Sequence, residues 1–67
     1  MQALNDLPTV NFQFRGVEGG KFAKDDDGRL SGELIGLPKG DLFIFQGYSL
    51  KELEEDFKIA VEQWLDK

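Results

Sequence analysis

Apolar and polar residues alternate along the first strand-like segment of the chain. From Thr9 onward every second residue is apolar, a period that predicts a strand with one buried face, formed by Val10, Phe12 and Phe14. Glycines then interrupt the alternation, and glycines inside a strand commonly mark a bulge or a close approach of two backbones. The alternation resumes at residues 21–23, so the pattern fits one bent strand or two short ones.

Two more strand-like segments follow, separated by turn sequences. Asp25–Gly28 has the composition of a hairpin turn, because aspartate suits a type I turn and glycine accepts the positive φ that closes it. Residues 29–36 predict a second strand, with one face formed by Leu30, Gly32 and Leu34. Residues 37–41 have turn composition, and Leu42–Phe45 is an apolar run of strand length. We expect this third strand to be buried on both faces, or buried on one face and open to a partner on the other.

The last third of the chain carries a helix-start signal. Ser49 and Glu52 have the spacing of a capping box, in which the Ser49 hydroxyl accepts from the Glu52 amide and the Glu52 carboxylate accepts from the Ser49 amide. At 100° per residue, one stripe of the following segment is apolar: Leu50, Leu53, Phe57, Ala60, Val61, Trp64 and Leu65. We expect a helix that packs this stripe on the sheet and ends near the carboxyl terminus.

These elements together predict an α+β domain. We expect a three-stranded antiparallel sheet with one C-terminal helix packed on one face, in the order β-β-β-α. Residues 1–8 show no periodicity and predict a flexible lead-in, so the domain covers residues 9–67. A core this small supplies only roughly 3–5 kcal/mol, and the absence of cysteine leaves no disulfide to add to it. We therefore expect the protein to self-associate as a homo-oligomer.

Charge narrows the choice of partner. Thirteen acidic and eight basic residues give a net charge of −5, which repels phosphate backbones and anionic membrane surfaces and attracts basic proteins. The longest apolar runs fall far short of the roughly 20 residues that a membrane helix needs, and the amino terminus has no signal-peptide pattern. We expect a cytoplasmic protein that binds neither nucleic acid directly nor a membrane.

Candidate catalytic, metal and cofactor sites fail on their spacing. If Gly28 took the sixth position of an EF-hand loop, the first and twelfth ligands would be Ala23 and Leu34, which cannot bind calcium. The chain has no histidine and no cysteine, so it lacks the common zinc ligands and the usual base for a serine nucleophile. The glycines match neither nucleotide-binding motif. We expect no catalytic residue, no metal and no cofactor, and hence no enzyme.

Partner-binding candidates lie on the predicted helix and the third strand. Ile59 lies opposite the apolar stripe, between Glu55 and Glu62, where an apolar residue suits either a partner contact or a chance exposure. The aromatic residues Phe43 and Phe45 fit either the core or an interface. We take these five residues as the predicted contact set.

The order of these features resembles the HicB antitoxin family and its stand-alone HicB-like relatives. The resemblance covers about three quarters of the chain, from Phe14 to Leu65. Its parts are Phe14-Arg15-Gly16, Asp25–Gly28, the strand end Gly32–Leu37, the exit Phe45-Gln46-Gly47 and the helix Ser49–Leu65.

The resemblance implies both a fold and a partner. The fold would be a fragment of the RNase H fold without its catalytic acids, and the partner a small basic RNA-cleaving toxin of the HicA type. Because the sequence ends at Lys67, directly after the predicted helix, we expect no DNA-binding extension. Our first hypothesis is an antitoxin that occludes this toxin. The alternatives are a self-assembling orphan of the family that pairs sheet edges, and a mobile-element inhibitor that uses the same fold on another basic target.

Overall fold

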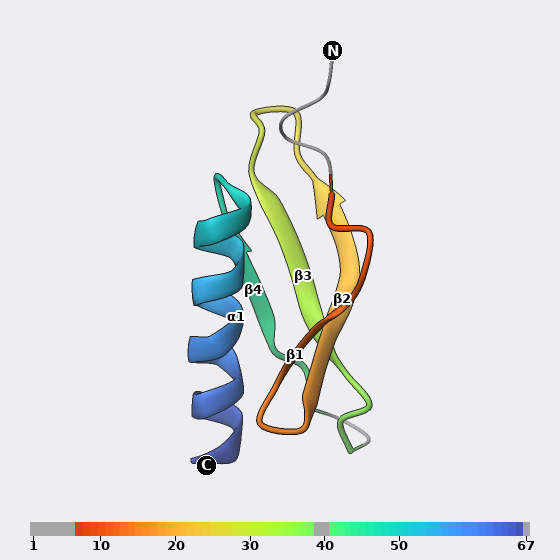
Figure 1. Cartoon of the computed structure of the whole chain (residues 1–67), viewed down its shortest axis with the longest axis vertical. Helices are drawn as coiled ribbons and strands as arrows, with labels where there is room; N and C mark the ends of the chain where they lie inside the picture. Colours follow the sequence, from red (N-terminus) through yellow and green to blue (C-terminus); the bar gives the residue numbers. More distant parts are fainter. Residues whose placement is uncertain (1–6, 39–40, 67) are drawn as a thin grey trace.

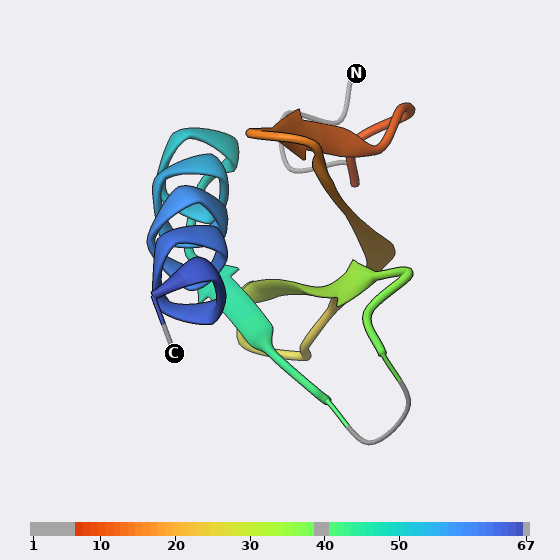
Figure 2. The ribbon, with the colours of Figure 1, turned by 90° about the horizontal axis from the view of Figure 1, so that it is seen from below.

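The computed structural model describes residues 7–38 and 41–66 and has an α+β fold. Four strands form one antiparallel sheet in the order of the chain: β1 (Phe12–Phe14), β2 (Val17–Lys24), β3 (Leu30–Ile35) and β4 (Ile44–Gly47). Helix α1 (Leu50–Leu65) follows β4 and lies along the sheet (Figure 1). Seen along the strands, the sheet is curled, and α1 lies inside the curl beside β4 (Figure 2). The α+β class and the C-terminal helix are as predicted.

The sheet has four strands, so the prediction of three was wrong. The reason is a tight turn at Arg15-Gly16, where both residues have positive φ, 54° and 81°. Phe14 pairs with Val17, so Arg15 and Gly16 form the whole loop between β1 and β2. A two-residue hairpin turn with positive φ at both positions matches the twist of the strands it joins. The first segment therefore folds as two strands, which was one of its two predicted outcomes.

The glycines of β2 mark both a bulge and a close approach. The β2–β3 register shifts between Gly20 and Ala23, and Lys21 between them has a positive φ of 54°. A Cβ added at Gly19 would lie 2.7 Å from the Phe57 ring, so this position leaves room for the aromatic core. Val10, in contrast, precedes β1 and is 72% exposed, so its predicted place on the buried face was wrong.

The hairpin between β2 and β3 forms at the predicted turn. The Asp25 amide donates to the Arg29 carbonyl at 2.8 Å, and Gly28 has a φ of +90°. Arg29 also binds Asp25 through its side chain, with Nε donating to Oδ2 at 3.1 Å. This hydrogen bond, together with the charge of Asp25, raises the pKa of the Arg29 guanidinium. The turn is thus closed by both backbone and side-chain contacts.

The core lies between the inner face of the sheet and α1. On β3, Leu30, Gly32 and Leu34 share one face as predicted, and the structure turns this face inward, with both leucines buried. The residues with the least exposure are Phe45, Phe57, Leu30, Leu53 and Val61. The ring of Phe57 lies 5.1 Å from that of Phe45 and 5.4 Å from that of Phe12, so aromatic side chains fill the centre.

The amino end of α1 is capped, with one change from the prediction. The Glu52 amide donates to the Ser49 hydroxyl at 3.1 Å, as expected. The Glu52 carboxylate accepts from the amide of Tyr48 at 2.9 Å, rather than from that of Ser49. The carboxylate therefore binds one residue further upstream than in a standard capping box.

We expect Ser49→Ala to lower the free energy of unfolding by about 1 kcal/mol, because the mutation leaves the Glu52 amide without its acceptor. Urea unfolding followed by the fluorescence of Trp64 measures this loss. Ser49→Asp is the control, since aspartate is an equally good cap and should restore the stability. A loss shared equally by both variants would contradict the capping role.

Candidate functional site

The solvent face of α1 presents an apolar residue among carboxylates. Ile59 is 51% exposed, and Glu55 and Glu62 are exposed beside it. These residues are spaced four and three apart, which places them one above another on a helix. We call this set, Glu55, Ile59 and Glu62, the α1 outer face. Its position agrees with the sequence prediction, because the middle of the opposite stripe packs into the core. The predicted burial of Leu50 and Leu65, at the two ends of that stripe, was wrong, since they are 43% and 42% exposed.

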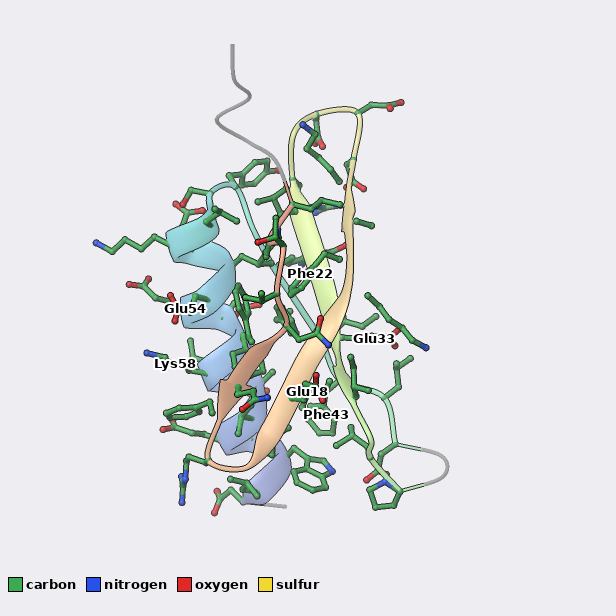
Figure 3. The ribbon with its side chains drawn as sticks, turned by 45° about the vertical axis from the view of Figure 1, so that its right-hand side comes forward. Glu18, Phe22, Glu33, Phe43, Glu54 and Lys58 are labelled. Carbon is green, nitrogen blue, oxygen red and sulfur yellow. The ribbon has the colours of Figure 1, made fainter. Side chains whose placement is uncertain are left out.

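Ion pairs do not neutralise the α1 outer face within residues 7–38 and 41–66. Ion pairs there include those of Lys21 with Glu33 and of Arg29 with Asp25, and both lie on the sheet side of the molecule. Lys58 points toward β1, with its ammonium 5.6 Å from the centre of the Phe14 ring. Figure 3 shows Lys58 on the same side of α1 as Glu54. The outer face therefore keeps a negative charge around an exposed isoleucine.

The two aromatic members of the predicted contact set lie elsewhere. Phe45 is 0% exposed and packs on Phe57, so its side chain cannot contact a partner, and its place in the contact set was wrong. Phe43 is partly buried and packs against the same core. The large apolar side chains that β4 and its lead-in expose are those of Leu42 and Ile44, at 64% and 60%. Sequence reasoning missed them because four successive apolar residues do not show which alternate pair faces inward.

A hollow of about 190 Å³ lies on the outer face of the sheet, opposite α1. In Figure 3, Glu33 marks this side of the sheet, and Glu33 Oε2 lies 3.7 Å from Lys21 Nζ. The hollow is smaller than the roughly 300 Å³ at which ligand pockets begin, and it adjoins the two exposed side chains of β4 and its lead-in. Its lining residues are Lys21, Ser31, Gly32, Glu33, Leu42 and Ile44.

A second hollow, of about 330 Å³, lies between the β1–β2 turn and the end of α1. Arg15 lines it from the turn, and Glu62, Leu65 and Asp66 line it from the helix. Small-molecule sites are lined mostly by apolar side chains, which desolvate the ligand. Among the lining residues of this hollow, Leu65 alone is apolar. The hollow therefore extends the acidic surface of α1 and has few features of a ligand pocket.

The described residues offer few other sites. Across residues 7–38 and 41–66, no three carboxylates lie together in a way that could hold a metal ion. In the same ranges, no helix has the length and apolar character needed to cross a membrane. The α1 outer face and the exposed side of β4 are thus the two surfaces with distinct chemistry.

Searches against family models, curated proteins and solved structures returned no match for this chain.

Proposed function

We propose that this chain is a protein-binding module that neutralises a small basic protein by covering it with the α1 outer face. The observation that carries the proposal is Ile59, 51% exposed between two exposed glutamates on a helix whose core-facing residues are Leu53, Phe57, Ala60 and Val61. An apolar residue inside a charged rim has the composition of a contact site, where the centre is desolvated and the rim stays in water.

Charge supports a basic partner. The net charge of −5 attracts a cationic protein over a distance of about one Debye length and speeds the encounter. Glu55 and Glu62 then lie at the contact itself, so they orient the partner as well as attract it. Inhibition by this route is steric and electrostatic, and it needs no catalytic group on this chain.

The resemblance to HicB-like domains suggests which basic protein is bound. It points to a small RNA-cleaving toxin of the HicA type, whose positive RNA-binding surface an acidic helix would cover. An antiparallel sheet followed by one helix is consistent with that family, and the relation to the RNase H fold belongs to the same proposal. The protein would then act as an antitoxin.

Reversing the charge of Glu55 and Glu62 tests the proposal. We expect Glu55→Lys with Glu62→Lys to slow association with the basic partner by about tenfold at low salt, because steering depends on these charges. The difference should shrink as salt is added, since exposed charges are screened. The association rate is measured by stopped-flow mixing of wild type or variant with the basic protein that co-purifies with the wild-type chain.

The matched control is Asp26→Lys with Asp27→Lys, two exposed residues of the β2–β3 turn. This pair changes the net charge by the same amount but lies away from α1. An equal loss of rate in both double variants would show that net charge alone matters and would contradict a binding role for the α1 outer face.

A further inference from the structure

Strand β4 is an edge of the sheet, and its register shows which backbone groups face outward. The Leu34 amide donates to the Phe43 carbonyl at 3.0 Å. In an antiparallel pair, hydrogen-bonded positions alternate, so Phe43, Phe45 and Gly47 direct their amides and carbonyls toward β3. The amides and carbonyls of Ile44 and Gln46 consequently point away from β3, to the side where no described strand follows.

Helix α1 covers only part of this edge. The Gln46 amide donates to Asp56 Oδ2 at 2.8 Å, which satisfies one outward donor. At the other end, Trp64 Nε1 donates to Asp41 Oδ2 at 3.0 Å. Between these two contacts lies Ile44, whose outward amide and carbonyl are presented on an uncharged stretch of strand. Edge strands are usually protected from pairing with other chains by charged residues, proline or a bulge, and the stretch around Ile44 has none of these.

The side chains at this edge are apolar on the outer face of the sheet. Leu42 and Ile44 are 64% and 60% exposed, and both line the hollow that lies beside them. A strand added to an edge contributes alternate side chains to each face of the sheet. The hollow and its two exposed side chains therefore provide an apolar contact for the outward-facing residues of an added strand.

A second copy of this chain does not fit the edge. Helix α1 packs more closely on β4 than on any other strand and is tied to both ends of it. Two β4 strands paired edge to edge would lie about 4.8 Å apart, so the α1 helices packed on them would crowd each other, because packed helices need roughly 8–10 Å between their axes. A single added strand without a helix above it meets no such obstacle.

The inner side of the edge is acidic. Asp56 lies on the flank of α1 that faces β4, because its Oδ2 accepts from the Gln46 amide. Glu52 is one turn away on the same flank and accepts from the Tyr48 amide. Basic side chains on the inner face of an added strand would lie next to these two carboxylates. The complementary sequence is therefore an extended segment in which apolar and basic residues alternate.

We propose that the β4 edge around Ile44 accepts an extended basic segment of a partner protein as a fifth strand. Its apolar side chains pack on Leu42 and Ile44, and its basic side chains face Glu52 and Asp56. The partner class is that of the proposed function and rests on it, but the surface differs from the α1 outer face. If an experiment disproves binding at one of these surfaces, binding at the other can still be tested.

A short peptide of alternating valine and lysine, added to the ¹⁵N-labelled full chain, tests the proposal. We expect NMR shifts centred on Leu42 and Ile44, and slower hydrogen exchange of the Ile44 amide, because that amide acquires an acceptor. Ile44→Lys should weaken binding about tenfold by removing apolar contact and adding like charge. Val10→Lys, at an exposed apolar site ahead of β1 and outside both proposed surfaces, should leave peptide binding unchanged.

Three results would overturn the proposal. One is an Ile44 amide that exchanges at the same rate with saturating peptide as without it. Another is binding that ignores the charges or the pairing amides of the peptide, seen as equal binding of an alternating valine–glutamate peptide or of a valine–lysine peptide with its pairing amides methylated. The third is protection of the Ile44 amide that grows with protein concentration in the absence of peptide, since a second copy would then occupy the edge.

Discussion

Replacing Phe57 with alanine is expected to leave the domain largely unfolded at room temperature. Phe57 is 1% exposed, and its ring contacts those of Phe45 and Phe12 across the space between α1 and the sheet. Removing a buried phenylalanine costs about 3–5 kcal/mol, which equals the roughly 3–5 kcal/mol that a core of this size supplies. Urea unfolding followed by Trp64 fluorescence and by circular dichroism measures the loss.

Ile59→Ala provides the control for this variant. It removes a large apolar side chain from the same helix, but from a position that is 51% exposed. Its free energy of unfolding should change by less than about 0.5 kcal/mol. A Phe57→Ala protein that melts as cooperatively as the wild type would show that the core does not depend on the aromatic contacts described above.

Gly47→Ala has the second largest expected effect, because β4 turns into α1 at this position. An added Cβ would lie 2.6 Å from the Leu53 amide nitrogen and 2.7 Å from the Glu52 carbonyl carbon. These are backbone atoms in the first turns of α1, so they cannot move aside as a side-chain tip could. We expect the free energy of unfolding to fall by about 3 kcal/mol, the upper end of the range for overpacking.

The companion variant for this prediction is Gly28→Ala. Gly28 also has no Cβ and sits at a φ of +90°, but an added Cβ there would meet nothing within 4 Å. It should lose only about 1 kcal/mol, from the strain of a positive φ. Equal losses in the two variants would mean that backbone conformation, and not the close approach of α1 to β4, makes Gly47 necessary.

Local sequence signals predicted the elements that local chemistry decides. Ser49 and Glu52 mark the start of α1 because both act within one turn of the helix. The run Asp25–Gly28 forms its hairpin because the turn is closed by its own residues and by Arg29. The common face of Leu30, Gly32 and Leu34 follows from the period of two along β3. In each case the deciding contacts lie within a few residues along the chain.

An unusual backbone conformation and contacts between distant residues decided what the sequence did not show. The turn at Arg15-Gly16 requires a positive φ at an arginine, which the residue type does not favour. Leu42–Phe45 is apolar throughout, so the sequence does not show which side chains of β4 face inward. The pairing of β4 with β3 decides this. The apolar run therefore predicts a contact role for Phe45, which the structure places in the core.

The two candidate surfaces differ in the same way. The α1 outer face could be predicted because helical period alone puts Ile59 among Glu55 and Glu62. The open part of the β4 edge could not, since it depends on the β3–β4 register and on a bond from Gln46 to Asp56, 10 residues away. Tertiary contacts thus reveal a surface that periodicity cannot show.

Affinity capture with the α1 outer face as the only variable tests the central claim most directly. Tagged wild-type protein and the Glu55→Lys, Glu62→Lys variant are exposed to lysate of the source organism, washed through a salt series and analysed by mass spectrometry. We expect the wild type alone to retain a small basic protein, which high salt removes. This protein should cleave RNA, and its cleavage should stop when purified wild-type chain is added. The same proteins on both baits, or a captured protein whose activity the chain does not inhibit, would contradict the account.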